Sequence, residues 1–165
     1  MFISLNKSAN GLRFPFVVSM LLFFFLLSGV NARAEPDKNY LRIEQNKLSE
    51  ENDLKISSIG ALVFEEHMQG HIDLSYLESD IHGNEWALDV GGGYVFNWDV
   101  SLFLGLGISL GYNGDKDDFI AAYYPEAGIV LDVTKTFGIT VSAKRFYNRY
   151  EENEDIVMMG FVFRN

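Results

Sequence analysis

Apolar and polar side chains alternate along most of the chain after residue 38, with a period of two residues. The segment Ser101–Asn113 (SLFLGLGISLGYN) is the most regular, because every second residue is large and apolar and the residues between are mostly small. A period of two places successive side chains on opposite faces of a β-strand, whereas a helix needs a period near 3.6. The pattern therefore predicts an all-β protein.

The same alternation recurs in eight segments, and we interpret each segment as a strand. They are residues 39–45, 54–64, 71–77, 85–96, 101–113, 122–133, 137–147 and 156–163. The second segment is the least regular, because apolar residues occur in both of its phases. One phase holds Leu54, Ile56, Leu62 and Phe64, and the other holds Ile59 and Val63.

The connections between these strands alternate in character along the chain. Polar and acidic stretches occupy residues 48–53, 78–84, 114–118 and 148–155, tight turns occupy residues 97–99 and 134–136, and residues 65–70 are intermediate. Consecutive antiparallel strands place alternate connections at opposite ends, so the acidic stretches all share one end. Longer loops at one end and short turns at the other are typical of a membrane-spanning meander.

The apolar face of the strands can lie against either a protein core or lipid. In a soluble exported barrel or sandwich the apolar phase lines the core, whereas in an outer-membrane barrel it faces lipid and the small or polar phase fills the interior. The small phase of 101–113 carries three glycines and two serines, a poor surface for contact with water. Glycines inside a narrow barrel leave room for larger neighbours, and the candidates for that interior are Arg42, Phe103, Tyr124, Lys144 and Phe146.

Aromatic residues gather near the strand ends, as expected where strands cross two membrane interfaces. Those toward the acidic connections are Tyr76, Tyr112, Phe119, Tyr123 and Tyr147, and those toward the tight turns are Tyr94, Phe96, Trp98, Phe137 and Phe163. Strands of this length also match the roughly 9–11 residues needed to cross a bilayer at a tilt. We therefore predict an eight-stranded antiparallel up-and-down transmembrane β-barrel.

The first 34 residues have the features of a secretory signal peptide. Lys7 and Arg13 precede an apolar run over 16–30, and Ala32-Arg33-Ala34 provides a small-residue cleavage site. The run is shorter than the roughly 20 apolar residues of a transmembrane helix. We predict a signal peptide at 1–34 and one barrel domain at 35–165.

Composition excludes several classes of function. Removing residues 1–34 leaves ten basic against 23 acidic residues, a net charge of −13, which disfavours nucleic acid as a partner. The chain has no cysteine and therefore no disulfide framework. Gly91-Gly92-Gly93 lies inside a strand pattern and not before a helix, so it is not a phosphate loop. No zinc pattern or nucleophile elbow is present, and we predict no catalytic, cofactor or metal residue.

These patterns together resemble the small eight-stranded outer-membrane β-barrels of Gram-negative bacteria, of the OmpX, OmpA membrane-region or YfaZ-like type. The resemblance is one of architecture and is carried by the alternation in 86–96, 101–113 and 126–133 and by the closing strand 156–163. Such barrels end in an aromatic residue, whereas Arg164 and Asn165 follow Phe163 here. Pro125 is also unusual for a strand, because it cannot donate to the ladder, and it marks either a bulge or the point where its strand leaves the membrane.

Charges of both signs occupy the small or polar phase and are predicted to fill the interior: Arg42, Glu44, Lys55, Asp73, Asp89, Glu126, Asp132 and Lys144. Eight strands leave an interior just wide enough for side chains, which favours a salt-bridged plug over an ion or proton path. A small, porin-like pore remains the alternative.

Two further groups of residues are candidate sites. The acidic residues Asp115, Asp117, Asp118, Glu151, Glu152, Glu154 and Asp155 form either a solvated surface or a site for divalent cations that bridge to lipopolysaccharide. His82 lies beside Ser79, Asp80 and Glu85, a constellation conceivable in a lipid A-modifying acyl hydrolase or transferase. Polar residues are also common in turns for purely structural reasons, and this interpretation is favoured here.

The prediction is a monomeric, non-enzymatic protein of the cell outer membrane with a structural or surface-interaction role, such as envelope integrity, adhesion or resistance. Its partners would be outer-membrane lipid, lipopolysaccharide and an extracellular protein that contacts the acidic loops. A soluble periplasmic ligand-binding barrel is the remaining alternative.

Overall fold

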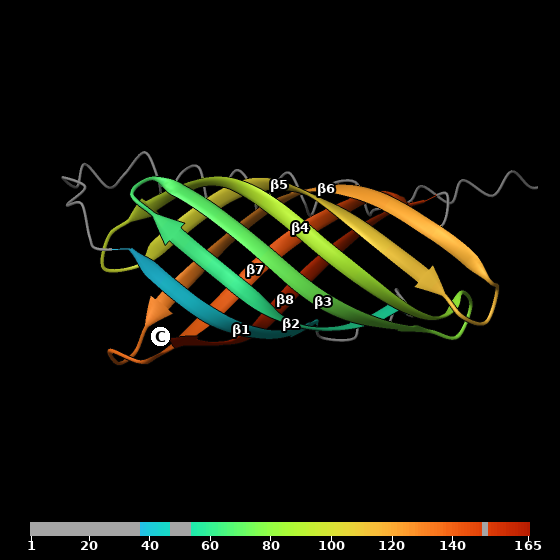
Figure 1. Cartoon of the computed structure of the whole chain (residues 1–165), viewed down its shortest axis with the longest axis horizontal. Helices are drawn as coiled ribbons and strands as arrows, with labels where there is room; N and C mark the ends of the chain where they lie inside the picture. The colour runs from blue at the N-terminus through green and yellow to red at the C-terminus, as the bar shows by residue number, and fades with distance from the viewer. Residues whose placement is uncertain (1–36, 47–53, 150–151) are drawn as a thin grey trace, which may run out of the picture. The chain divides into compact units, whose positions relative to one another are not determined.

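Eight antiparallel strands form a closed barrel in the structure, a computed structural model that describes residues 37–46, 54–149 and 152–165. The strands are β1 (Lys38–Asn46), β2 (Leu54–Glu65), β3 (Met68–Ser79), β4 (Gly83–Asn97), β5 (Ser101–Asn113), β6 (Asp118–Asp132), β7 (Phe137–Arg149) and β8 (Glu152–Arg164). Each strand pairs with the next along the chain, and β1 pairs with β8 to close the sheet (Figure 1). The predicted up-and-down barrel is confirmed. The predicted signal peptide at 1–34 lies outside the described residues.

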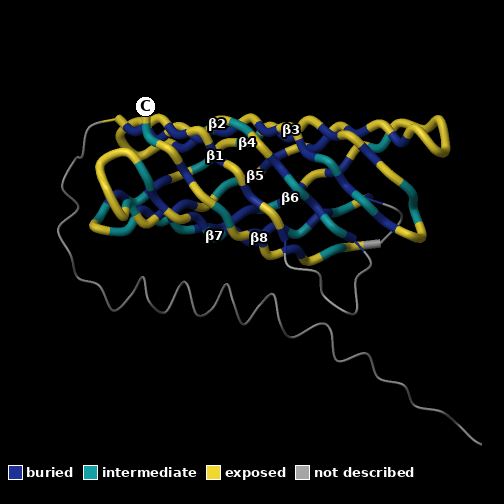
Figure 2. Tube along the Cα trace, turned by 90° about the horizontal axis from the view of Figure 1, so that it is seen from below, coloured by how far each residue is buried: buried dark blue, intermediate teal, exposed yellow. Residues whose placement is uncertain are grey.

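Buried and outward-facing positions alternate along every strand (Figure 2). In β5 the predicted faces are confirmed: Phe103 and Ser109 are buried inside the barrel, while Leu104 and Leu106 point outward. The pleat of a strand produces this alternation, and closing the sheet turns one of its faces into an interior. The outward face of the barrel is rich in Leu, Ile, Val and aromatic side chains. No helix among the described residues is long and apolar enough to cross a membrane.

The faces of β2 reverse the general rule that the apolar phase points outward. Leu62 and Phe64 are fully buried inside the barrel, whereas Ile59 points outward. Phe64 packs against Tyr40 and Phe103, with ring centroids 5.7 and 5.9 Å away. The expectation that the more apolar phase always faces outward is therefore wrong for β2, because part of the interior is itself an apolar cluster.

The glycines of the inward phase make room for large interior rings, as predicted. A Cβ atom added at Gly107 would lie 2.6 Å from the hydroxyl oxygen of Tyr124, and one added at Gly128 would contact the ring of Phe103. Arg42, Tyr124, Lys144 and Phe146, together with Phe103, are all buried in the interior. The five residues proposed to fill the barrel are therefore confirmed in that position.

Most connections are shorter than the sequence predicted, although the turn at 133–136 is one residue longer than the predicted 134–136. At one end, here called the acidic end, residues 80–82 join β3 to β4 and residues 114–117 join β5 to β6. At the opposite end, the turn end, the joining residues are 66–67, 98–100 and 133–136. Most of the predicted acidic loop at 148–155 belongs to β7 and β8, so long strands extend where longer loops were expected. The predicted connection 48–53 lies outside the described residues.

Pro125 lies within β6 and causes neither a bulge nor the end of the strand. Its partner on β5 is Leu106, in a register that continues without a shift along the whole pair. On the other side of β6, the pairing with β7 passes from Tyr123 to Glu126 and skips Tyr124 and Pro125. The missing amide hydrogen therefore falls at a gap in the ladder, which is how the strand accommodates the proline.

Outward-facing aromatic residues form contacts near both ends of the barrel. Near the acidic end the ring pairs are Tyr76–Trp86, Tyr112–Phe119 and Tyr123–Tyr147. Near the turn end they are Tyr94–Phe96, Phe96–Trp98 and Phe137–Phe163. Two aromatic zones with an aliphatic band between them match the expected surface of a barrel that crosses two interfaces.

Candidate functional site

An ionic cluster centred on Arg42 crosses the middle of the barrel. The guanidinium group of Arg42 bonds to both carboxylate oxygens of Asp73, on β3, and to Glu126 Oε1, on β6, at 3.3 Å. Glu44 Oε2 lies 3.5 Å from Arg42 Nε. The side chains of these four residues are at most 1% exposed, so these charges interact where water screens them little.

Two further residues join this cluster through Glu126, one on β3 and one on β7. Lys144 Nζ lies 3.9 Å from Glu126 Oε1, and His71 Nδ1 lies 3.3 Å from Glu126 Oε2. The other ring nitrogen of His71 is 2.9 Å from the Tyr124 hydroxyl. The network thus reaches from β1 and β3 across the interior to β6 and β7. Such a network ties opposite walls of the barrel together.

Most of the charges predicted for the interior are confirmed there. Arg42, Glu44, Asp73, Asp89, Glu126 and Lys144 are buried, and Asp132 is partly buried beside Lys38 and Tyr40 at the turn end. The prediction is wrong for Lys55, which points outward and forms a 2.6 Å ion pair with Glu78. Because Leu54 and Ile56 point inward, Lys55 between them must point outward.

Apolar side chains fill the interior on both sides of the ionic cluster. Toward the acidic end the buried set is Leu54, Ile56, Leu77, Ala87, Ala122, Tyr124, Phe146, Ile156 and Met158. Toward the turn end it is Tyr40, Leu62, Phe64, Val95, Phe103, Val130 and Val162. Buried polar side chains accompany both clusters, among them Ser75 and Asp89 toward the acidic end and Lys38 and Ser101 toward the turn end. Side chains of both kinds therefore fill the interior along the barrel, as expected of a plug.

A second buried ion pair near the acidic end was missed in the sequence. Arg149 Nη2 donates to Glu85 Oε1 at 2.6 Å, and Arg149 Nη1 donates to Ser109 at 3.4 Å. The side chains of Arg149 and Glu85 are at most 1% exposed. Glu85 begins the predicted strand 85–96, whereas Arg149 falls in the predicted connection 148–155, and only their place in the inward phase of the alternation could have identified the pair.

Of the four residues considered for acyl transfer, Ser79 and Glu85 have structural roles. Ser79 Oγ accepts the backbone amides of Ile81 and His82, at 3.3 and 3.0 Å, which is the hydrogen bonding of a turn. Glu85 is buried in the interior beside Arg149. Asp80 is exposed in the turn that follows β3. No cluster of three His, Cys, Asp or Glu among the described residues is arranged to hold a metal ion.

Hydrogen bonds connect the two described turns of the acidic end. Asn113 Nδ2 donates to the carbonyl oxygen of His82 at 2.6 Å, and the Asn84 amide donates to Asp115 Oδ2 at 2.9 Å. Gly83 has a φ of +82° at this junction, a conformation that favours glycine. Two acidic side chains here have defined partners, since Asp115 accepts the Asn84 amide and Asp117 accepts the Tyr112 hydroxyl at 2.8 Å. The acidic end therefore presents an ordered surface over these turns.

Comparisons with known proteins identify the architecture. No protein family model matches the chain, and no curated protein sequence matches it. A de novo designed transmembrane β-barrel matches with a TM-score of 0.59 at 16% identity, over 79% of this chain and 98% of the designed one.

Natural barrels also match. The N-terminal β-barrel domain of OprF from Pseudomonas aeruginosa matches with a TM-score of 0.56 at 17% identity, over 81% of this chain and all of that domain. Neisserial surface protein A is 12% identical over 78% of this chain and 92% of its own, with a TM-score of 0.49. The chain thus has the fold of the small eight-stranded outer-membrane β-barrels, as its alternation predicted.

Proposed function

We propose that this protein is a monomeric, non-enzymatic barrel of the cell outer membrane, with a structural or surface-interaction role. The observation that carries the proposal is the combination of an apolar outward face with an interior filled by side chains. The outward band between the two aromatic zones suits a hydrocarbon medium, and the interior contains two apolar clusters on either side of the ionic cluster.

The arrangement of the interior favours a structural role over transport. Eight strands leave an interior just wide enough for side chains, and the two apolar clusters and the buried ion pairs occupy that space. Within the middle layer, Arg42 already forms bonds with Asp73 and Glu126. The charged side chains therefore serve to hold the barrel walls together.

The surface-interaction part of the proposal rests on the acidic end. Its two described turns are linked by the bonds of Asn113 and Asp115, so they form a joint, ordered surface of the kind that a protein partner can recognise. Envelope integrity, adhesion and resistance to host factors are the roles that such a surface supports. Lipopolysaccharide would contact the outer part of the same barrel wall.

Cell fractionation with surface labelling tests this proposal. The full-length chain is expressed in a Gram-negative host, and a cysteine is introduced at Lys116, in the turn between β5 and β6. We expect recovery with the outer membrane and labelling of intact cells by a membrane-impermeant maleimide. A cysteine at Lys135, in a turn at the other end, is the matched control and should react only after lysis. Recovery in the soluble periplasm would refute the proposal.

A further inference from the structure

A hydrogen-bonded pair of polar side chains interrupts the apolar outward face. Gln45 Nε2, on β1, donates to Ser57 Oγ, on β2, at 3.2 Å, and both side chains point away from the interior. Gln45 is the register partner of Met159 on β8, and Ser57 is the register partner of Tyr76 on β3. The pair thus lies between larger side chains on both sides.

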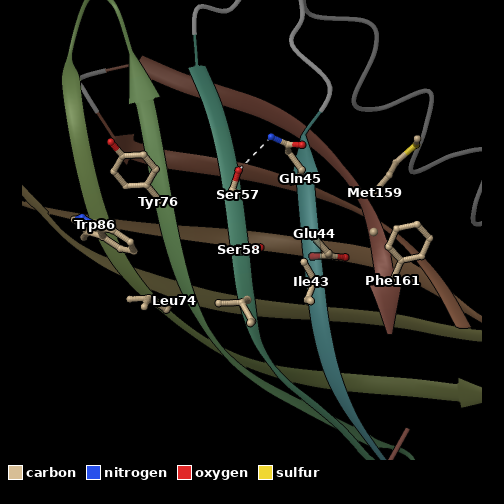
Figure 3. A pocket seen from close by; sticks show the side chains of 12 residues that line it. Ile43, Glu44, Gln45, Ser57, Ser58, Leu74, Tyr76, Trp86, Met159 and Phe161 are labelled. Carbon is tan, nitrogen blue, oxygen red and sulfur yellow. Dashed lines mark hydrogen bonds between the residues drawn. The ribbon is translucent and has the colours of Figure 1, made fainter. Parts of the chain in front are cut away.

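This difference in side-chain size creates a groove of about 500 Å³ on the outward face (Figure 3). Tyr76 and Trp86 form one wall, with ring centroids 4.8 Å apart, and Met159 and Phe161 form the other. Figure 3 shows the Gln45–Ser57 bond between these two walls. Toward the turn end the groove is continued by aliphatic side chains, those of Ile43, Ile59 and Leu74. It is therefore apolar over most of its length and polar at one level.

The polar level of the groove lies close to the acidic end of the barrel. Tyr76 and Trp86 belong to the aromatic zone of that end, where the wall meets the membrane interface. Two residues beyond Ser57 and Tyr76, Lys55 and Glu78 form an outward ion pair at 2.6 Å. These two charges satisfy each other, so the groups left to recognise an occupant are those of the polar level. The proposed function puts this end at the cell surface, and the groove then opens to the outer leaflet.

The Gln45–Ser57 pair offers hydrogen-bonding groups of both kinds to an occupant. Gln45 Oε1 is an acceptor, and the Ser57 hydroxyl and the second amide hydrogen of Gln45 are donors. An acyl chain joined through an ester brings only acceptor oxygens, which leaves Gln45 Oε1 without a donor at the edge of the hydrocarbon. A chain joined through an amide also brings an N–H group. The polar level therefore favours an amide-linked chain.

We propose that this groove binds one amide-linked, hydroxylated acyl chain of lipid A, the membrane anchor of lipopolysaccharide. The amide N–H of the lipid donates to Gln45 Oε1, and the hydroxyl group of the chain accepts from the Ser57 hydroxyl. The rest of the chain lies between the two walls, along Ile43, Ile59 and Leu74. The inference rests on the proposed function, which places the acidic end at the cell surface, and it gives lipopolysaccharide a defined position on the barrel wall.

Native mass spectrometry of the full-length protein, folded in non-ionic detergent, tests the inference. The protein is mixed with equal amounts of lipid A and phosphatidylglycerol, which is also anionic but has only ester-linked chains, and retained lipid is counted. Ser57→Trp fills the groove, and Ala121→Trp places the same side chain on the outward face of β6 as the matched control. We expect the wild type to retain one lipid A molecule, S57W to retain at least about tenfold less, and A121W to match the wild type.

A second variant tests the polar level. Gln45→Met combined with Ser57→Ala removes the acceptor and the donors while leaving the groove open. Its retention of lipid A relative to phosphatidylglycerol should fall by about three- to tenfold. Equal retention of the two lipids by the wild type, full retention of lipid A by S57W, or an unchanged preference in the double variant would overturn the inference.

A boiled and unboiled gel of each sample separates failure of the groove from failure of the proposed function. A heat-dependent band shift without a preference for lipid A contradicts only the groove. A missing shift in the wild type contradicts the membrane barrel itself.

Discussion

Leu106→Arg is the substitution that separates a lipid-facing from a water-facing surface most clearly. Leu106 is the sixth residue of the 13-residue strand β5, close to the middle of the barrel wall. Its register partners are Gly92 and Pro125, which are too small to cover it, and its side chain is 70% exposed. In a bilayer this side chain lies in the hydrocarbon near the midplane.

The size of the effect follows from that position. An arginine on the lipid face of a barrel costs about 2–4 kcal/mol at the midplane and about 0–1 kcal/mol near the interfaces. If water covered this face, a substitution so exposed would change the free energy of unfolding by less than about 0.5 kcal/mol. Leu102→Arg, at the turn end of the same strand, is the matched control and should fall in the interfacial range.

Reversible denaturant unfolding from lipid vesicles measures both variants against the wild type, with tryptophan fluorescence as the signal. We expect L106R to lower the free energy of unfolding by at least about 2 kcal/mol and by clearly more than L102R. Equal effects of the two substitutions, or a negligible effect of L106R, would refute the placement of this face in lipid.

The remaining predictions concern the interior. Gly107→Ala should lower the free energy of unfolding by about 1–3 kcal/mol, because the added Cβ would displace the Tyr124 ring. Gly114→Ala is the control and should be neutral in the same denaturation assay, because a Cβ added there has no atom within 4 Å. Equal values for the two variants would contradict the close packing of the interior. Arg42→Met should cost about 3–5 kcal/mol, since it leaves buried carboxylates without a partner, and a stability equal to the wild type would contradict the ionic cluster. In planar bilayers the wild-type protein should show no discrete conductance steps, because buried side chains fill the interior, and regular steps would contradict the plug.

The alternation alone was enough to predict the fold where one phase is clearly apolar. In β5 the contrast between Leu106 and Gly107 assigns each face, and the structure confirms both. The closed order of strands follows because antiparallel neighbours joined by short turns leave only β1 and β8 to pair. The large interior residues Phe103 and Tyr124 were predictable for the same reason, since they occur in the small phase of their strands.

The sequence-based assignment of faces was wrong or incomplete where the interior is itself apolar and where a polar residue occupies a strand end. Leu62 and Phe64 face inward because they pack with rings from other strands, which only the three-dimensional register brings together. Lys55 was assigned inward because β2 has apolar residues in both phases. The Glu85–Arg149 pair joins residues 64 positions apart, and local sequence carries no signal for such a contact.

The most direct test of the central claim is the migration of the refolded protein, boiled and unboiled, on a gel containing dodecyl sulfate. The chain is refolded into phospholipid vesicles and, in parallel, into buffer without lipid. Our account predicts a heat-dependent shift in migration only for the vesicle sample, because the outward apolar face requires lipid and the closed barrel resists the detergent until it is boiled. A folded, soluble protein in the lipid-free sample, with no shift in vesicles, would contradict it and would place water on the face that carries Leu106.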